Sequence, residues 1–353
     1  MEIDDELLAP FRALGRGRAT ADQHAAVLAS MATEEPLASP YNGRVLLAGD
    51  WHGNTGYGVD VLHHARRQHA SVVVQLGDFG FSTDGEGYLD VLSATAQSLD
   101  VTLLVVDGNH EDFPLLERFP VLSDGPGKGL RPVRPQLWHL PRGTRWTWAE
   151  LDGTCGRWLA VGGAASVDRA LRTEGHSWWS AEELTEEEAD RIAAGGPVDV
   201  VVCHDRPQAA AVALGDRPEE WWSRAPKAWA RKDLARSDAH AARLQRVVDA
   251  VRPARVWHGH LHQRTDVLLD AAAAGEACTV HGLDMDGKPL KKSTAVVGVD
   301  GASVDAAPRA AIDDLREPGS TIPPRTRGWQ HPEPHIADGP SNEELLREMR
   351  GDR

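Results

Sequence analysis

Five short polar clusters hold the side chains that could do chemistry in this chain, and each follows a run of apolar, largely β-branched residues. The clusters read GDWHG, GD, GNHED, CHD and HGHLH, and their chemically versatile residues are Asp50, His52, Asp78, Asn109, His110, His204, His260 and His262. Ligand crevices form at the carboxyl ends of strands in open α/β sheets. We therefore expect these groups to converge, although more than 200 positions separate the first from the last.

Carboxylate, imidazole and amide oxygen form a mixed ligand set that suits Mn, Fe, Zn, Co or Ni better than Ca or Mg alone. Eight such residues are too many for one ion, and seven of them would serve as the ligands of two ions. Two ions roughly 3.5 to 4 Å apart can hold both the attacking and the leaving oxygen of an in-line phosphoryl displacement. The residue types therefore predict two divalent metal ions, with Mn the first choice in vitro, and hydrolysis of phosphate esters.

The competing interpretation of these residues is turn and capping chemistry, because Asp, Asn and Gly are favoured after strands for conformational reasons. It accounts for an aspartate or an asparagine at any single position. It does not account for histidine in four of the five clusters. We therefore favour the metal site.

Taken in order, the five motifs D-x-H, G-D, G-N-H-E, a lone His and G-H-x-H resemble those of the calcineurin-like metallophosphoesterase superfamily. The match runs from about Gly43 to Arg264. The resemblance implies an α/β fold, a four-layer αββα sandwich with a dinuclear site at the strand ends of its centre. It assigns the ligands of the first ion to Asp50, His52 and His262, the bridge to Asp78, and the ligands of the second ion to Asn109, His204 and His260.

The resemblance also makes His110 the catalytic acid instead of a ligand. Two cations lower the pKa of a shared water and neutralise the phosphoryl oxygens, so we expect a metal-bridged hydroxide to attack phosphorus without a covalent intermediate. His110 can protonate the leaving alkoxide because the unperturbed pKa of histidine lies near neutrality. Glu111 and Asp112 are both candidates to orient this histidine.

The chain departs from the protein Ser/Thr phosphatase branch after the second motif. That branch continues with Asp-Arg-Gly, which places an arginine over the phosphate, whereas Gly77-Asp78 here continues as FGFSTDG. A replacement lies between Gly162 and Arg172, in a segment that resembles the Gly-Gly-x-x-Ser-x-Asp element of small bacterial and phage-type metallophosphoesterases. Arg169 or Arg172 can fork two hydrogen bonds onto a phosphate, and the alternative for either is a local ion pair with Asp168 or Glu174.

The elements that must place these residues alternate between strands and helices, which indicates an α/β domain. Nearly continuous apolar runs predict buried strands at 45–48, 72–76, 101–106, 159–161, 198–203 and 255–258. Helical patterns lie between several of them, at 60–68, 88–99, 181–194 and 239–251, the third with a capping box at Thr185 and Glu188. No helical pattern separates the run at 145–148 from that at 159–161, and none separates 278–283 from 294–299, which predicts a second, more antiparallel sheet.

We divide the chain into an N-terminal helical extension (1–42), a metallophosphoesterase domain (43–304) and a flexible, Pro- and Gly-rich tail with a short terminal helix (305–353). Within the domain, residues 206–238 are too many for a plain connection. We interpret them either as a cap over the site or as an irregular surface insertion. The tryptophan pairs at 178–179 and 221–222 either line a substrate cleft or pack in the core.

The composition limits which classes of molecule we expect this protein to bind. A formal charge of −15, from 53 acidic and 38 basic residues, works against nucleic-acid binding. No apolar run reaches bilayer length, the first residues lack the pattern of a signal peptide, and three widely spaced cysteines fit a reducing compartment. We therefore expect a cytoplasmic protein, without membrane association, that acts on a small phosphorylated substrate in preference to a phosphoprotein.

Two alternative functions compete with this prediction. One is a catalytically silent scaffold of the same fold that binds partner proteins, and the complete ligand set together with His110 argues against it. The other is a nuclease of the DNA-repair type. The acidic charge and the lack of a basic cluster near the motifs argue against a nuclease.

Overall fold

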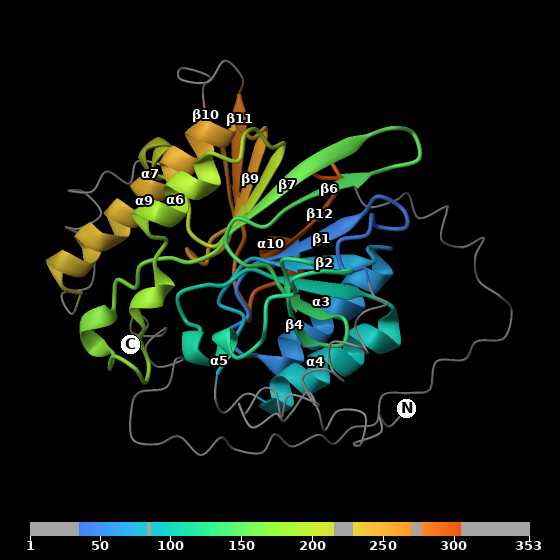
Figure 1. Cartoon of the computed structure of the whole chain (residues 1–353), viewed down its shortest axis with the longest axis horizontal. Coiled ribbons are helices and arrows are strands. Elements are labelled where there is room, and N and C mark those ends of the chain that lie inside the picture. Colours follow the sequence, from blue (N-terminus) through green and yellow to red (C-terminus); the bar gives the residue numbers. More distant parts are fainter. Residues whose placement is uncertain (1–34, 83–85, 215–228, 270–276, 305–353) are drawn as a thin grey trace, which may run out of the picture. The chain divides into compact units, whose positions relative to one another are not determined.

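Two six-stranded mixed sheets form the centre of the fold (Figure 1). The computed structural model describes residues 35–82, 86–214, 229–269 and 277–304. Residues 35–42 form turns and bends, while 1–34, the tail at 305–353 and the tryptophan pair at 221–222 lie outside the described residues. The predicted helical extension and tail therefore stay predictions.

The first sheet has the strand order β12-β1-β2-β3-β5-β4. Its four inner strands run parallel, and they are β1 (Val45–Ala48), β2 (Val72–Gln75), β3 (Thr102–Val105) and β5 (Leu137–His139). The edge strands β12 (Thr294–Val297) and β4 (Arg131–Arg134) are antiparallel to their neighbours.

The second sheet repeats this plan in the order β10-β11-β9-β8-β7-β6. Its parallel inner strands are β11 (Cys278–Gly282), β9 (Arg255–His258), β8 (Val200–Cys203) and β7 (Cys155–Val161). The antiparallel edges are β10 (Thr265–Leu269) and β6 (Arg145–Ala149).

Helices cover the outer face of each sheet. Helices α3 (Thr55–Arg67) and α4 (Glu86–Leu99) contact the first sheet, and α6 (Glu186–Ala193) and α9 (Arg231–Val251) share a core with the second. The described residues also form short helices: α5 (Phe113–Glu117), η1 (Arg169–Leu171), η2 (Ser180–Glu182), α7 (Gln208–Ala213) and α10 (Leu290–Ser293). The predicted four-layer αββα sandwich is therefore confirmed.

The alternation of side chains along β7 shows how the second sheet serves two cores. Trp158 and Ala160 lie in the core shared with the first sheet, whereas Leu159 and Val161 lie in the core under α6 and α9. Successive residues of a strand point to opposite faces, so a strand buried on both sides must be apolar throughout. This is why the apolar runs predicted most of the inner strands, although the inner strand β5 (Leu137–His139) was not predicted.

The predicted division of strands between the sheets was wrong in part. Strands β8 and β9, expected beside β1, β2 and β3, belong to the second sheet, and the run at 294–299 pairs with β1 in the first. Hydrophobicity specifies that a strand is buried but not which strand pairs with it. The capping box at Thr185 and Glu188 is confirmed, but α6 begins only at Glu186, later than predicted. Every helix within the described residues is too short or too polar to cross a membrane.

Candidate metal centre

The polar clusters meet where strand ends of the two sheets lie together. Asp50 and Asp78 follow β1 and β2 of the first sheet, and His204 and His260 follow β8 and β9 of the second. Two hydrogen bonds join the sheets here: the backbone N–H of His260 donates to Asp50 Oδ1 at 2.9 Å, and His204 Nδ1 donates to the Leu76 carbonyl oxygen at 2.8 Å. Convergence thus occurs between two sheets, not along the edge of one.

Two groups of metal-ligating atoms share one carboxylate. Within each group the ligand atoms lie within 4.8 Å of one another, and the groups are Asp50, His52, Asp78 and His262, and Asp78, His204 and His260. Asn109 adjoins the second group, because its Oδ1 lies 3.1 Å from His204 Nε2. The structure thus brings all seven predicted ligands together, with Asp78 placed between the two groups.

The donor chemistry of the site fits divalent transition metals. Asp50 and His204 are fully buried, and Asp78 is 1% exposed. Nε2 of His52 is buried without a hydrogen-bond partner and lies 3.6 Å from Asp78 Oδ2. Buried carboxylates and unpaired imidazole nitrogens are costly unless an ion is coordinated there, and this nitrogen and oxygen set suits Mn, Fe, Zn or Co.

Hydrogen bonds behind two histidines fix which nitrogen faces the site. His204 and His52 each use Nδ1 away from the centre, the latter for Asp286 Oδ1 at 3.0 Å. Asp286 is fixed in turn by Asn54 Nδ2, which donates to its Oδ2 at 2.8 Å. Such outer hydrogen bonds turn Nε2 of each histidine toward the candidate site, where it could bind a metal ion. Asp286 was not predicted from the sequence, although it follows strand β11 just as the predicted ligands follow theirs.

The backbone at the site is strained. Eight non-glycine residues within the described chain have positive φ, and four of them are predicted ligands, with φ between 46° and 65°: His52, Asp78, His260 and His262. A non-glycine residue in this region costs about 1 to 3 kcal/mol and persists where its surroundings over-determine it. Strain concentrated on the ligands indicates that their positions are held for function.

Motif glycines permit the close approach of the ligands. A Cβ on Gly77, where φ is 96°, would lie 2.4 Å from His204 Nδ1, and one on Gly259 would lie 2.2 Å from Asp50 Oδ1. Neither position has space for any side chain. This explains why a glycine precedes the aspartate or histidine in these motifs.

Electrostatics at the centre favour positive charge. Burial alone would lower the pKa of His52 and of His204, but nearby carboxylates, Asp286 and Asp78 for the first and Asp78 for the second, raise both pKa values to about 10. Burial opposes ionisation of Asp78 too, yet His204 and His110 hold its pKa well below the usual range. In the absence of metal, protons on the histidines balance the buried carboxylates.

His110 lies beside the ligands with its ring against an arginine. Its backbone N–H donates to Asp78 Oδ1 at 2.9 Å, and Nη2 of Arg172 lies 2.8 Å from both ring nitrogens. Burial and the Arg172 guanidinium lower the pKa of His110 to about 3, so the ring is neutral near pH 7. Arg172 also pairs with Asp168 at 2.8 Å, whereas Arg169 lies over the Trp178 ring, 4.0 Å from its centroid.

The two acidic residues after His110 have structural tasks. The Glu111 carboxylate is fully buried and accepts the backbone N–H groups of Phe79 at 2.7 Å and Phe81 at 2.8 Å. Asp112 accepts the N–H of Leu115 at 3.0 Å and caps α5. Both side chains thus bind backbone groups near the site, and the side chain hydrogen-bonded to the His110 ring is that of Arg172.

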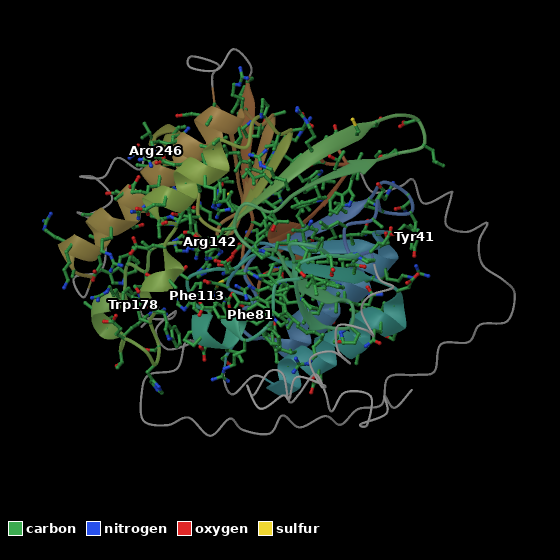
Figure 2. The ribbon with its side chains drawn as sticks, viewed as in Figure 1. Tyr41, Phe81, Phe113, Arg142, Trp178 and Arg246 are labelled. Carbon is green, nitrogen blue, oxygen red and sulfur yellow. The ribbon has the colours of Figure 1, made fainter. Side chains whose placement is uncertain are left out.

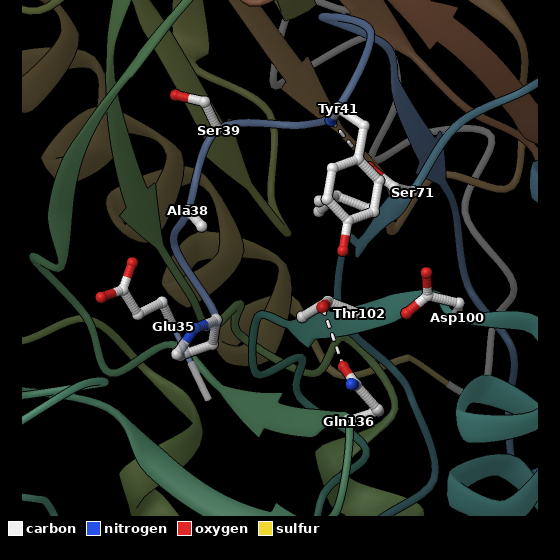
Figure 3. Close-up of a pocket in the computed structure, with 10 residues that line it drawn as sticks. Glu35, Ala38, Ser39, Tyr41, Ser71, Asp100, Thr102 and Gln136 are labelled. Carbon is white, nitrogen blue, oxygen red and sulfur yellow. Dashed lines mark hydrogen bonds between the residues drawn. The ribbon is translucent and has the colours of Figure 1, made fainter. Parts of the chain in front are cut away.

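A separate pocket of about 350 Å³ lies at the opposite, amino-terminal ends of β2 and β3 (Figure 3). Tyr41, Ser71, Thr102 and Gln136 are among its lining residues, and Thr102 donates to Gln136 Oε1 at 2.9 Å. Its lining contains none of the predicted ligands. The chemistry predicted from the motifs therefore belongs to the metal centre.

A known protein family matches this chain in sequence, and solved structures show a distant likeness to it. The sequence model of the calcineurin-like phosphoesterase family matches residues 43–264, more than half of the chain. None of the curated proteins matches it. Among solved structures, the protein TT1561 of Thermus thermophilus is 11% identical over 73% of this chain and 99% of its own, with a TM-score of 0.41. A dimetal phosphatase from Danio rerio is 12% identical over 74% of this chain and 93% of its own, also with a TM-score of 0.41.

Proposed function

The chain belongs to the calcineurin-like phosphoesterase family and is a metal-dependent phosphoric ester hydrolase, and from this premise we propose that it hydrolyses small phosphomonoesters or phosphodiesters with two divalent ions. The observation that carries the proposal is the position of Asp78 in both ligand groups. One carboxylate shared by two groups is what a pair of ions about 3.5 to 4 Å apart requires.

The residues divide between the two ions as follows. Asp50, His52 and His262 would hold the first ion, Asp78 would be shared by both, and Asn109, His204 and His260 would hold the second. When bound, such ions supply a hydroxide nucleophile near neutral pH and neutralise charge on the phosphoryl oxygens. We propose Mn as the ion that supports activity in vitro, because the mixed oxygen and nitrogen set suits it.

Arg172 and His110 act together on the substrate in this proposal. The guanidinium, held by Asp168, donates to His110 only while that ring is neutral. A phosphate that enters the site takes over the Arg172 hydrogen bonds in a forked arrangement. Its negative charge then raises the pKa of His110, which can carry a proton to the leaving oxygen. Arg169 is assigned to the packing of this loop on Trp178.

A small substrate is favoured over a polymer. The chain has a formal charge of −15, and the arginine of the Asp-Arg-Gly motif is absent after Asp78. Long anionic polymers are repelled by such a charge, whereas a compact phosphate ester is attracted locally by the two ions and Arg172. A phosphopeptide is the second choice.

The test uses metal-free protein reloaded with Mn²⁺ and assayed on p-nitrophenyl phosphate, its bis ester and an alkyl phosphate. Turnover should return with the metal, and His110→Asn should retain both ions but lower kcat by about two to four orders of magnitude. The loss should be smaller for p-nitrophenolate, which leaves without a proton. The control is His64→Asn on helix α3, which should behave as the wild type.

Three results would contradict parts of this proposal. If no divalent ion restores turnover on any phosphate ester, the hydrolase function is wrong and the scaffold alternative stands. If His110→Asn lowers kcat equally on alkyl and p-nitrophenyl substrates, His110 is not the proton donor to the leaving group. Cleavage of duplex DNA in preference to small esters would favour the nuclease.

A further inference from the structure

A buried chain of hydrogen bonds lies behind Asn109. Its Nδ2 donates to Ser166 Oγ at 3.0 Å. The Ser166 hydroxyl donates to Glu182 Oε2 at 2.6 Å, and the Ser166 backbone N–H donates to Oε1 of the same carboxylate at 2.8 Å. Asn109 and Ser166 are each 2% exposed, and Glu182 is fully buried. Bulk water therefore does not compete for these hydrogen bonds.

The far end of this chain is held firmly in place. The Glu182 carbonyl oxygen accepts the N–H of Ala164 at 3.1 Å and Nη2 of Arg142 at 3.1 Å. Arg142, labelled in Figure 2, is itself anchored by the buried Asp107 carboxylate, which accepts its Nε at 2.8 Å. The loop that carries Ser166 and the turn that carries Glu182 are thus fastened to each other through backbone and side chains.

A hydroxyl group has one proton, and this decides how Asn109 is oriented. Because Ser166 gives its proton to the Glu182 carboxylate, it can only accept a hydrogen bond from Asn109. The NH₂ group of Asn109 must then face Ser166, and Oδ1 must face His204 and the second ligand group. With the amide rotated by half a turn, NH₂ would face that group, and an amide nitrogen offers no lone pair to a metal ion.

We propose that Ser166 and Glu182 are positioning residues that hold the Asn109 amide with its oxygen toward the second metal ion. The inference rests on the two-metal site proposed above. Partners behind a metal ligand are typically worth about 10- to 100-fold in metal affinity. Their loss should therefore weaken binding of the second ion by about this factor. Binding of the first ion should be unchanged, because the hydrogen bonds of Ser166 and Glu182 lead to Asn109 and not to the ligands of the first ion.

The first experiment is calorimetric titration of the metal-free full-length protein with Mn²⁺. We expect two binding steps in the wild type. In Ser166→Ala, the step in which the second ion binds should be weakened about 10- to 100-fold, and the other step should be unchanged. The matched control is Ser93→Ala, which removes another buried serine whose hydroxyl donates to a carbonyl oxygen, that of Pro135, at 2.7 Å. The control should bind both ions normally. Equal weakening of both steps in Ser166→Ala, or none, would overturn the proposal.

A second variant separates orientation from packing. In Glu182→Gln the new amide can donate to Ser166 Oγ while its oxygen still accepts the Ser166 N–H, so the Ser166 proton becomes free to face Asn109. That proton favours the inverted orientation of the Asn109 amide. The affinity for the second ion should therefore fall at least as much as in Ser166→Ala, while the melting temperature should stay close to that of the wild type. Normal binding of the second ion by Glu182→Gln would contradict the proposed role.

A double-mutant cycle gives the sharpest test. In the Asn109→Asp background both side-chain atoms are oxygens, so no orientation has to be chosen. The loss of affinity for the second ion caused by Ser166→Ala should therefore shrink to less than about threefold. A loss that stays at full size in this background would indicate a general structural role and would overturn the inference. The titration measures binding, so wild type that binds two ions but hydrolyses no phosphate ester would refute only the proposed function.

Discussion

Metal binding should depend steeply on pH, because each ion must displace a proton. His52 belongs to the first ligand group and His204 to the second, and carboxylates, despite the opposing effect of burial, raise the pKa of each to about 10 in the metal-free protein. Burial lowers the pKa of His260 to about 4, so that ligand is already neutral. Between about pH 7 and about pH 8, His52 and His204 stay protonated, and each ion releases one proton from them.

The magnitude follows from this proton count. A binding constant linked to the release of one proton rises about tenfold per pH unit. The affinity for each ion should therefore rise about tenfold from about pH 7 to about pH 8, and the product of the two constants about 100-fold. The assay is titration of metal-free protein with Mn²⁺ in buffers of different ionisation enthalpy, which counts protons directly.

Metal affinity rises with pH, but the folding stability of the metal-free protein should fall as the pH rises. A histidine whose pKa is raised on folding stabilises the fold fully below its unfolded pKa near 6.5, and this contribution is lost as the pH rises through about 10. The melting temperature of the metal-free protein should thus fall across that range, while bound ions replace the protons and flatten the fall. His64→Gln, on helix α3, should leave the proton count unchanged. Affinities that do not change between the two pH values, or binding without proton release, would refute the reasoning.

Three substitutions test other parts of the site. Asp78→Asn should lower metal content and activity together, because the two cations then lack the negative charge that they share. The loss of metal affinity should exceed the 10- to 100-fold that is typical when a residue behind a ligand is removed. Full metal content in elemental analysis would contradict this. Arg172→Ala should lower kcat/KM about 10- to 100-fold, the worth of a charged hydrogen bond to phosphate, with both ions retained; unchanged kinetics with a lower melting temperature would make Arg172 only an ion-pair partner of Asp168. Glu111→Ala should lower the free energy of unfolding by at least about 3 kcal/mol, because the N–H groups at 79–81 lose their acceptor; denaturant unfolding measures it, and a loss below about 1 kcal/mol would be evidence against the structural role.

The sequence by itself predicted most of the inner strands, though not β5, and the residues that the structure brings together at the candidate metal centre. Strands β1 and β9 begin and end where the apolar runs predict, because strands covered on both faces must be apolar at every position. The motif glycines could also be recognised, since close backbone approach leaves no space for a Cβ. Helix α3 begins five residues earlier than predicted, at Thr55, because Asn54 caps it by accepting the N–H of Tyr57.

Only the tertiary structure decided how the strands divide between the sheets and which residues support the ligands. The pairing of β12 with β1, and of β8 with β7, depends on contacts between distant segments that share the same apolar character. Asp286 follows a strand as the predicted ligands do, and Ser166 lies in the Gly-Gly-x-x-Ser-x-Asp element. However, neither feature, nor the sequence around Glu182, indicates which distant residue each of them contacts. Arg169 and Arg172 differ in role for the same reason: three positions apart in one loop, they point to different partners, and only the packing of that loop against Trp178 and His110 distinguishes them.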